Sequence, residues 1–505
     1  MTTDFLERLA MQADRIPDAS ALGAVGERAL TYRELVDTVD RVAYNLGAAG
    51  FRPGDRMLFS IRPSVSSVTL IFGVIAAGGT IVFVDPGVGP ELFDQRVKLV
   101  EPTWAATESL LYAVSGPLAG FGRRRGLSLP RFGALDVRHV HSGPWLPGTP
   151  SGSIPLHRFT GPAAGTANVP VDPEAPALIV FTSGTTDEPK AVVHTRASLG
   201  AGLAAMSGRT SLAPGAFLHT EQLMMGLPAL MAGARWAMPP YPRFGTHIDP
   251  VRFTQALHSA THAFYTPADL AVALDALESG AISPPPYLRQ VALGGAPVTS
   301  ALLRRARKSL PSTEFLAIYG MTEILPVAVT NDVAKLAHSG DLLGAPVPGV
   351  VARIADDGEL VLAGPNLCRG YLGADPLPEV PTGDLARWDG DQLVLTGRKK
   401  DMMIRGKTNI YPGLYEPVIT AIDGVRAAIM IGIPDEIGDE RIVLAVVSDP
   451  DTSDVAALLR TRLPQIIDTT AVPDDIVIVD RIPVSGRTNK PDRAALRELL
   501  REQLA

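Results

Sequence analysis

The sequence contains the stretch Ala177-Leu-Ile-Val-Phe-Thr-Ser-Gly-Thr-Thr-Asp-Glu-Pro-Lys190, in which an apolar run passes directly into small, hydroxyl-bearing residues and a lysine. A strand that leads into such residues frees backbone N–H groups and hydroxyls to surround a polyphosphate, and the lysine adds positive charge. The spacing differs from the Gly-x-x-x-x-Gly-Lys-Ser/Thr of a P-loop, so the stretch predicts another kind of phosphate-binding loop. Because an ordinary polar turn has a similar composition, the accompanying segments decide between the two interpretations.

Helices and short apolar strands alternate upstream of this loop. Residues 32–48 predict a helix, because apolar residues recur on one face: Leu35, Val39, Val42 and Leu46. A turn at Pro53-Gly-Asp55 and an apolar strand at Met57–Ile61 follow. This alternation is typical of an α/β sheet.

The segment Pro63–Val84 carries no charge and is long enough to suggest a membrane span. However, Gly78-Gly79 interrupts it, and the β-branched residues in Thr80–Val84 are typical of a buried strand. We therefore predict a helix, a tight turn and a strand within a packed α/β layer, and no membrane span.

The composition divides the rest of the chain into modules. Residues 142–173 are rich in Gly, Pro and Ser and predict an extended surface connection, after which regular alternation resumes at residues 175–339. Residues 347–395 contain short strands separated by Asp- and Gly-containing turns and predict a β-rich module. A small terminal unit is expected to contain two apolar strands and a charged helix: residues 427–433, 442–447 and 492–503.

We therefore predict an α/β protein with two domains, since 505 residues are too many for one compact core. The large N-terminal domain, residues 1–396, would contain two α/β subdomains and the β-rich module. The small C-terminal domain, residues 397–505, would be an α+β unit.

The overall composition is that of a folded protein, with 46% hydrophobic and 20% charged residues. A net charge of −7 argues against a general nucleic-acid or membrane-surface binder. The single cysteine, Cys368, excludes an intramolecular disulfide and a cysteine-based metal site. Because the first residues include acids and no long apolar run, we expect no signal peptide and a cytoplasmic location.

Five further segments carry residues suited to a nucleotide. Leu293-Gly-Gly-Ala-Pro297 follows an apolar strand, and its glycines let the backbone lie against a flat ring. Tyr319-Gly-Met-Thr-Glu323 offers an aromatic face, a hydroxyl and a carboxylate, and Thr382-Gly-Asp384 offers a carboxylate that can accept from two ribose hydroxyls. Gly397-Arg-Lys-Lys-Asp401 lies at the predicted domain junction, and Lys490 lies near the C-terminus.

Together with the opening loop, these segments resemble the ordered motif set of the AMP-forming ligase superfamily, which includes acyl-CoA synthetases, luciferases and nonribosomal-peptide adenylation domains. The resemblance extends from about Leu30 to Leu496. It implies that ATP and Mg²⁺ convert a small carboxylic acid into an acyl-adenylate with release of pyrophosphate. The acyl group would then pass to CoA or a carrier thiol, and a mobile C-terminal domain would rotate between the two half-reactions.

The resemblance also implies roles for individual residues. The ATP phosphates would be bound by the opening loop and by one threonine of the segment Tyr319–Glu323: Thr182, Ser183, Gly184, Thr185, Thr186, Lys190 and Thr322. The adenine would lie against the glycine-containing segments and an aromatic ring: Gly294, Gly295, Ala296, Pro297, Tyr319 and Gly320. Asp384 and Arg398 would bind the ribose, and Glu323 would hold Mg²⁺. Lys400 would be the hinge residue, and Lys490 would bridge the substrate carboxylate and the α-phosphate.

These residue types suit the chemistry, because a carboxylate is a poor nucleophile toward a polyanion. Cations must neutralise both partners, and a preorganised Lys490 and Mg²⁺ would stabilise the charge that builds on the oxygens around the α-phosphorus. No covalent protein nucleophile is required.

Four positions depart from the family pattern. Asp187 and Ala191 stand where glycine is common, and Leu414 stands where many members carry an acid. We expect ATP binding to survive Asp187, because Asp tolerates left-handed backbone angles. Asn489 replaces the glycine that usually precedes the catalytic lysine, which leaves the placement of Lys490 open.

The acyl-binding region is expected around residues 217–228. His219 resembles a histidine that gates the acyl pocket of acyl-CoA synthetases, and a hydrogen-bonded core histidine is an equal alternative. Met224, Met225 and Leu227 suggest an apolar pocket or ordinary core packing. No aspartate here corresponds to the one that holds the ammonium of an amino acid in peptide synthetases.

A narrower resemblance links residues 84–89, 319–327 and 414–418 to β-lactone synthetases of bacterial olefin biosynthesis. In those relatives the β-hydroxyl of a bound β-hydroxyacyl-adenylate displaces AMP, and no CoA is needed. Ile404-Arg-Gly-Lys407 instead keeps the pattern of thioester-forming members. A third alternative is a catalytically inactive nucleotide-binding regulator, which the departures beside the loop and beside the lysine would favour and the retained charged residues oppose.

Overall fold

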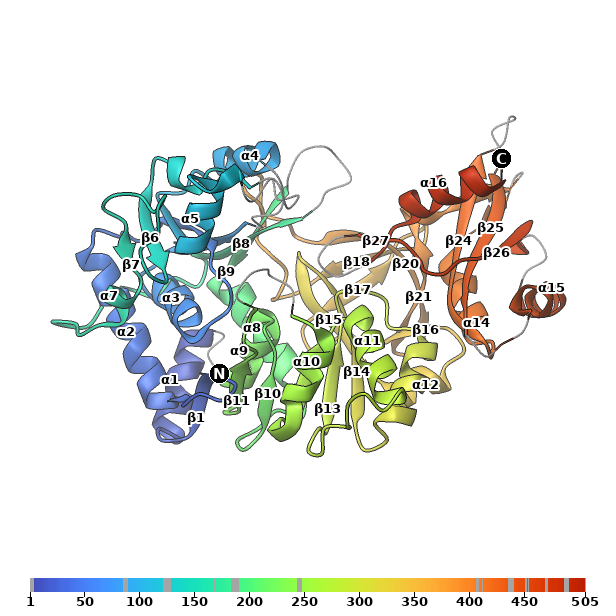
Figure 1. Cartoon of the computed structure of the whole chain (residues 1–505), viewed down its shortest axis with the longest axis horizontal. Coiled ribbons are helices and arrows are strands. Elements are labelled where there is room, and N and C mark those ends of the chain that lie inside the picture. Colours follow the sequence, from blue (N-terminus) through green and yellow to red (C-terminus); the bar gives the residue numbers. More distant parts are fainter. Residues whose placement is uncertain are drawn as a thin grey trace. The chain divides into compact units, whose positions relative to one another are not determined.

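The computed structural model (Figure 1) describes the following residues: 4–84, 90–120, 129–167, 169–182, 190–242, 248–405, 408–410, 412–434, 440–449, 452, 454–467, 471–485 and 490–504. The chain forms two compact units, each made of several segments. Unit 1 consists of Met1–Ile248, Thr322–Leu325 and Gly364–Pro378, and unit 2 consists of Asp249–Met321, Pro326–Ala363 and Glu379–Ala505.

Unit 1 contains a sheet with the strand order β19-β9-β8-β4-β3-β5-β6-β7. Its strands have these bounds: β3 (Arg56–Ser60), β4 (Thr80–Phe83), β5 (Trp104–Glu108), β6 (Arg138–Ser142), β7 (Ile154–Pro155), β8 (Pro176–Thr182), β9 (Lys190–Thr195) and β19 (Gly370–Tyr371). The strands from β8 to β7 pair in parallel, whereas β9 pairs antiparallel with β8 and β19. Thr182 therefore lies at the carboxyl end of a central strand, the edge at which α/β sheets usually bind ligands.

Two helices of unit 1, α2 (Tyr32–Ala48) and α3 (Val65–Ala76), pack against each other (Figure 1). Each begins with a capping box that satisfies its first N–H groups, formed by the pairs Thr31–Glu34 and Ser64–Ser67. Helix α2 confirms the helix predicted at residues 32–48. Helix α3, the left-handed Gly78 (φ 77°) and strand β4 confirm the prediction for the uncharged segment. Within the described parts of the chain, no helix is long and apolar enough to cross a membrane.

Unit 1 contains a second group of strands: β1 (Ser20–Ala24), β2 (Leu30–Thr31), β10 (Phe217–His219) and β11 (Arg235–Met238). Strand β11 pairs in parallel with both β1 and β10. Near them, Arg196 at the start of α8 (Arg196–Ser207) donates to Asp4, with Nε and Oδ2 2.7 Å apart, and both side chains are buried. This ion pair ties the N-terminal helix α1 (Phe5–Arg15) to the rest of the unit.

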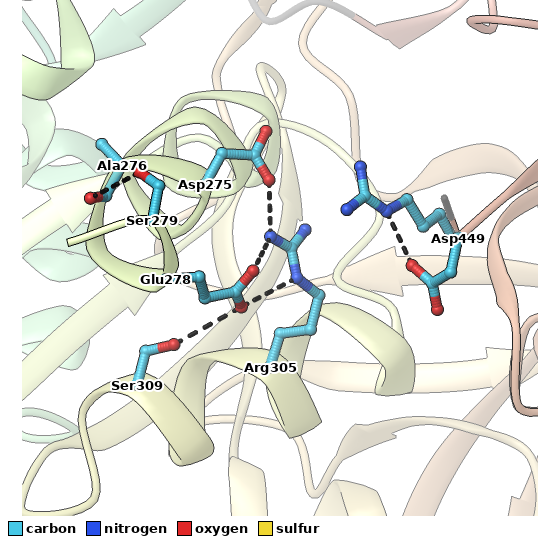
Figure 2. Close-up of polar contacts among 8 residues, drawn as sticks. Asp275, Ala276, Glu278, Ser279, Arg305, Ser309 and Asp449 are labelled. Carbon is cyan, nitrogen blue, oxygen red and sulfur yellow. Dashed lines mark hydrogen bonds and ion pairs between the residues drawn. The ribbon is translucent and has the colours of Figure 1, made fainter. Parts of the chain in front are cut away.

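In unit 2, strands β12 (His262–Tyr265), β13 (Gln290–Leu293) and β14 (Glu314–Met321) pair in parallel. Helices α11 (Pro267–Glu278) and α12 (Ser300–Ser309) pack together beside them. Figure 2 shows one polar contact between the helices, in which Arg305 donates to Asp275 at 2.7 Å and to Glu278 at 2.8 Å. Because these groups are partly exposed, the contact aligns the helices and adds little to stability.

The β-rich module predicted at residues 347–395 is confirmed. It is an antiparallel sheet in unit 2 with the strand order β16-β21-β20-β18-β17. The strands have these bounds: β16 (Asp341–Gly344), β17 (Val351–Ile354), β18 (Glu359–Ala363), β20 (Val380–Asp389) and β21 (Gln392–Arg398). Gly358 and Gly390, at φ 84° and 61°, make the two predicted turns in a conformation that favours glycine.

The C-terminal part of unit 2 contains the expected strands and helix. Its strands are β22 (Met403–Arg405), β23 (Thr408–Ile410), β24 (Val425–Pro434), β25 (Glu440–Ser448), β26 (Asp475–Ile478), β27 (Val484–Ser485) and β28 (Lys490–Pro491). Its helices are α14 (Pro412–Thr420), α15 (Val455–Ile466) and α16 (Arg493–Leu504). Strands β24 and β25 and helix α16 confirm the three elements expected there, and the domain boundary at residue 397 stays a prediction.

The extended connection predicted at residues 142–173 is partly wrong. Strand β7 pairs in parallel with β6, and helix α7 (His157–Thr160) packs against α2 and buries Phe159. The Gly- and Pro-rich composition concealed these elements, because a two-residue strand or a one-turn helix has no periodicity to detect.

Gly73→Ala is expected to destabilise unit 1, because a β-carbon at residue 73 would lie 2.2 Å from Cγ1 of Val42 and would force α2 and α3 apart. We expect a loss of about 1–3 kcal/mol in the free energy of unfolding, measured by urea denaturation. Gly47→Ala on α2 is the control, since a β-carbon there has no neighbour within 4 Å outside its own helix, and it should be neutral or slightly stabilising. Equal effects of the two changes would contradict this account.

Candidate active site

The predicted phosphate loop connects two paired strands. Strand β8 ends at Thr182 and β9 begins at Lys190, and these two residues are partners in the antiparallel register. Ala191, one of the departures from the family pattern, is the second residue of β9 and is buried in a core cluster of unit 1. The loop residues between the strands lie outside the described residues, among them the predicted Ser183, Gly184, Thr185 and Thr186 and the unusual Asp187.

Tyr371 joins two of the predicted site residues in unit 1. Its hydroxyl donates to Oε1 of Glu323 at 3.0 Å, and the Lys190 ammonium lies 5.3 Å from the centre of its ring. Glu323 is only 6% exposed, whereas Lys190 is exposed. The structure therefore brings a buried acceptor carboxylate to the hydroxyl of one aromatic side chain and an exposed cation to its ring.

Burial and the Glu323 charge shape the chemistry of this cluster. Together they raise the pKa of Tyr371 to about 12, so its hydroxyl remains protonated and donates at neutral pH. They also raise the pKa of Cys368 to about 11, so its thiol stays neutral and is a poor nucleophile. The backbone N–H of Cys368 donates to the Glu323 carbonyl at 2.7 Å, which fixes the main chain at the carboxylate.

His194 on β9 is a neighbour of the site that no sequence motif pointed to. Its Nε2 donates to the Thr322 carbonyl at 2.7 Å, and its Nδ1 lies 3.4 Å from the Ser198 hydroxyl. Burial lowers the pKa of His194, so the ring is neutral at pH 7. The neutral ring thus holds the peptide backbone that joins Thr322, the predicted α-phosphate ligand, to Glu323.

The donor set around Glu323 fits a magnesium ion that also binds phosphate. Mg²⁺ is usually held by one or two carboxylates, with phosphate oxygens and water completing its octahedron. In the parts of the chain that the structure describes, no group of three or more His, Cys, Asp and Glu residues could hold a metal by itself. The assignment of Glu323 as the protein ligand of Mg²⁺, with nucleotide and water oxygens completing the coordination, stays a prediction.

A second cluster, in unit 2, contains the residues predicted to bind the ribose. Asp384 is 6% exposed and accepts from the Tyr319 hydroxyl at Oδ2 and from Arg398 Nε at Oδ1, each at 2.7 Å. Burial and the Asp384 charge raise the pKa of Tyr319 well above its ordinary value, so this hydroxyl also remains a donor. Each carboxylate oxygen has a second lone pair and can still accept from a ribose hydroxyl.

The glycine-rich segment after β13 keeps its backbone uncovered at one residue. Gly294 is buried, and a β-carbon there would lie 3.5 Å from the Ile318 carbonyl, while Gly295 is exposed with a left-handed φ of 80°. Ala296 is half-buried and Pro297 is exposed. Together with Gly320 and the ring of Tyr319 on β14, this segment retains its predicted adenine-binding role as a hypothesis.

Lys490 lies exposed at the start of β28, where it pairs with Ser485. Arg493, three residues later, is anchored on three sides: it donates to both Glu416 oxygens at 2.7 and 2.8 Å, to the Met430 carbonyl at 2.7 Å, and lies 3.3 Å from Asp401. Although burial alone would lower the pKa of Arg493, the charges and hydrogen bonds of Glu416 and Asp401 hold it above its ordinary value. Lys490 is thus an exposed side chain close to a segment that the contacts of Arg493 hold in place.

The neighbours of this anchor include the predicted hinge. Asp401 ends the short helix η4 (Lys399–Asp401), which contains Lys400. Asn489, the residue that departs from the family pattern beside Lys490, lies outside the described residues. Leu414 in α14 is 41% exposed, so its surroundings do not require an acidic side chain at this position.

The predicted acyl-binding residues lie in the interior of unit 1. His219 on β10 is wholly buried, as are Met225 and Leu227 on α9 (Leu223–Met231), and Met224 packs against the same core. This placement suits both alternatives for these residues, an apolar pocket wall and ordinary core packing. The gating role of His219 stays a prediction.

Comparisons with known proteins agree with this architecture. The sequence profile of the AMP-binding enzyme family matches residues 9–372, and that of the AMP-binding enzyme C-terminal domain matches residues 415–490. Feruloyl-CoA synthase from an Amycolatopsis species is 29% identical over 492 residues, covering 91% of this chain and 92% of that protein. The 3-[(3aS,4S,7aS)-7a-methyl-1,5-dioxo-octahydro-1H-inden-4-yl]propanoyl:CoA ligase from Mycobacterium tuberculosis is 30% identical over 535 residues, and the alignment covers 98% of each chain.

The fold also matches solved structures. The amide bond synthetase McbA from Marinactinospora thermotolerans aligns with 98% of this chain and 99% of its own, with a TM-score of 0.79 at 23% identity. This likeness confirms the predicted fold class, a large α/β region with a small C-terminal domain.

Arg493→Met is expected to destabilise the C-terminal part by about 3 kcal/mol, because the Glu416 charge would remain half-buried without its partner. Urea denaturation followed by circular dichroism measures the loss. Adding Glu416→Gln should restore at least about 1 kcal/mol, since the amide carries no charge and can still accept from the Met430 N–H. Arg497→Met on the same helix is the control, because Arg497 donates to one carbonyl, that of Gly432, and its loss should cost only about 1 kcal/mol. A larger loss from the control would contradict the anchoring role of Arg493.

Proposed function

Because the chain belongs to the AMP-binding enzyme family, we propose that it uses ATP to convert a carboxylic acid into an acyl-adenylate and pyrophosphate, and then transfers the acyl group to CoA or another thiol. The observation that carries the proposal is the cluster at the end of the loop strands, where Lys190 and Glu323 meet the same tyrosine. A separate cation and a separate carboxylate are what a phosphate chain with its Mg²⁺ requires.

The nucleoside would be held by the second cluster. Asp384 would accept hydrogen bonds from the two ribose hydroxyls, and Arg398, whose Nε lies 2.7 Å from Oδ1, orients this carboxylate. The Tyr319 ring would lie against the adenine, and its hydroxyl supports the same carboxylate. Mg²⁺ bound at Glu323 would supply positive charge for the phosphate oxygens.

Lys490 would act in the first half-reaction. Its ammonium would neutralise the incoming carboxylate and the charge that develops around the α-phosphorus. The anchoring of Arg493 supports this role, because an exposed lysine on a fixed strand can reach a substrate without losing its position. His219, in the acyl-binding region, would contact the acid.

Two forms of the proposal differ in the group that accepts the acyl group. Relatives named as CoA synthase and CoA ligase support thiol transfer, while the resemblance of residues 319–327 to β-lactone synthetases supports ring closure by a β-hydroxyl. Mass spectrometry of reactions with a β-hydroxy acid, with and without CoA, separates them. A thioester only in the presence of CoA supports the ligase, and a lactone formed without any thiol excludes it.

Lys490→Met is expected to lower ATP–pyrophosphate exchange about a hundredfold or more, because a charge partner of the transition state is lost. Transfer of the acyl group from a supplied acyl-adenylate to CoA should change less than about threefold, since no phosphorus is attacked in that step. Exchange is measured with a panel of fatty, aromatic and β-hydroxy acids.

The matched control for this lysine is Lys308→Met, which removes an exposed lysine from α12 and should leave both half-reactions unchanged. If the unmodified chain exchanges no pyrophosphate with any acid while it still binds ATP, a nucleotide-binding regulator replaces the ligase.

Asp384→Asn is expected to weaken ATP binding about ten- to a hundredfold, because hydrogen bonds to a charged group contribute about 1.5–3 kcal/mol. Isothermal titration calorimetry measures the dissociation constant directly. Asp389→Asn at the far end of β20 is the matched control, since this exposed carboxylate pairs with His338 and should leave ATP affinity unchanged. Unaltered affinity in the Asp384 variant would remove this residue from the nucleotide site.

A further inference from the structure

Tyr371 occupies a position between the two charged groups of the phosphate cluster. Its hydroxyl donates to Glu323 at 3.0 Å, and its ring lies 5.3 Å from the Lys190 ammonium. Although Lys190 and Glu323 meet the same side chain, these two described residues form no ion pair with each other. The tyrosine is half-buried, so it is fixed by its surroundings and still borders the cluster.

The backbone of residues 367–372 fixes this tyrosine to both partners. Toward Glu323, Leu367 forms a bridge with Ile324 and the Cys368 N–H donates to the Glu323 carbonyl at 2.7 Å. Toward Lys190, strand β19 pairs with β9, with Tyr371 opposite Val192. The segment thus crosses from one charged residue to the other and carries Tyr371 between them.

Direct pairing of Lys190 with Glu323 would work against nucleotide binding. A lysine–carboxylate ion pair neutralises both groups, and each would have to be separated before it could meet a phosphate or a metal ion. A phenol avoids this cost, because its hydroxyl satisfies the carboxylate without neutralising it and its ring attracts an ammonium without quenching it.

We propose that Tyr371 is a positioning residue that orients the Glu323 carboxylate for Mg²⁺ and keeps Lys190 apart from it, so that both charges remain available to the phosphates. The proposal rests on the proposed function, since it assigns Tyr371 to the phosphate and metal part of that site. The hydroxyl of Tyr371 orients Glu323 and its ring attracts Lys190, so substitutions can remove the two contributions separately.

Tyr371→Phe removes the hydroxyl and keeps the ring. We expect the Mg²⁺ concentration needed for half-maximal ATP binding to rise about tenfold, while ATP affinity at saturating Mg²⁺ changes less than about threefold. Tyr371→Leu removes the ring as well and should also weaken ATP binding at saturating Mg²⁺, by about three- to tenfold. Calorimetric titration of ATP into the full chain at a series of Mg²⁺ concentrations measures both effects, and thermal unfolding without ligand measures stability.

A matched control is Tyr32→Phe, which removes a buried hydroxyl of the same unit that donates to the Leu230 and Ala234 carbonyls at 2.9 and 2.8 Å. It should lower the unfolding temperature and leave the Mg²⁺ dependence unchanged. In a Glu323→Gln background, Tyr371→Phe should have no further effect on Mg²⁺ dependence, because the hydroxyl acts through that carboxylate.

Two results distinguish failure of this proposal from failure of the proposed function. A Tyr371→Phe variant with unchanged Mg²⁺ dependence, beside a Glu323→Gln variant that loses it, overturns the role of Tyr371 and leaves the ligase intact. An equal shift in both the unmodified and the Glu323→Gln backgrounds overturns it as well, since the hydroxyl would then act elsewhere. If the unmodified chain binds no ATP at any Mg²⁺ concentration, the proposed function itself fails.

Discussion

Electrostatic repulsion between a carboxylate and a polyphosphate is the constraint on which this site depends. An acid can approach the α-phosphorus only where cations offset the charge of both reactants, and those cations must not already be neutralised by the protein. This requirement applies to the cluster around Tyr371 and not to the cluster around Asp384. Asp384 is paired directly with Arg398, which suits a carboxylate that only accepts hydrogen bonds, whereas a tyrosine separates Glu323 from Lys190. Whether a carboxylate pairs directly with a cation or contacts a tyrosine thus follows from the ligand that it would bind.

Anions and cations also differ in how firmly they are held. Glu323 and Asp384 are each 6% exposed and have donors on their oxygens, while Lys190 and Lys490 are exposed at the ends of strands. A buried carboxylate loses little conformational entropy when a ligand binds, and a long lysine can follow a substrate whose geometry changes during reaction. In the cluster around Tyr371, a buried carboxylate beside an exposed lysine would therefore suit a ligand whose charge changes when ATP becomes the adenylate.

Local sequence patterns predicted much of this molecule, and contacts between distant residues account for what they missed. The helix at residues 32–48 and the helix, turn and strand of the uncharged segment follow from periodicity and glycine placement, and the structure has them. Tyr371 and Glu323 are 48 residues apart, and Arg493 and Glu416 are 77 apart, so no local pattern connects them. Likewise, strand β7 is too short to show a period and is stabilised by its pairing with β6. The types of residue at the site could be predicted from the sequence, but their contact partners could be identified only from the folded structure.

The replacement of glycine by Asn489 illustrates how the fold can compensate for a local change. Glycine before the lysine would allow the backbone unusual angles on the upstream side, but the position of Lys490 is also set from the downstream side. There the Asp492 N–H donates to the Pro483 carbonyl at 2.8 Å, and the Asp492 carboxylate accepts from the Ala495 N–H at 2.9 Å, which fixes the start of α16. Arg493 then ties that start to α14 and β24. Because Lys490 is only two residues from this fixed point, the anchored helix constrains its backbone from the downstream side, whichever residue precedes it.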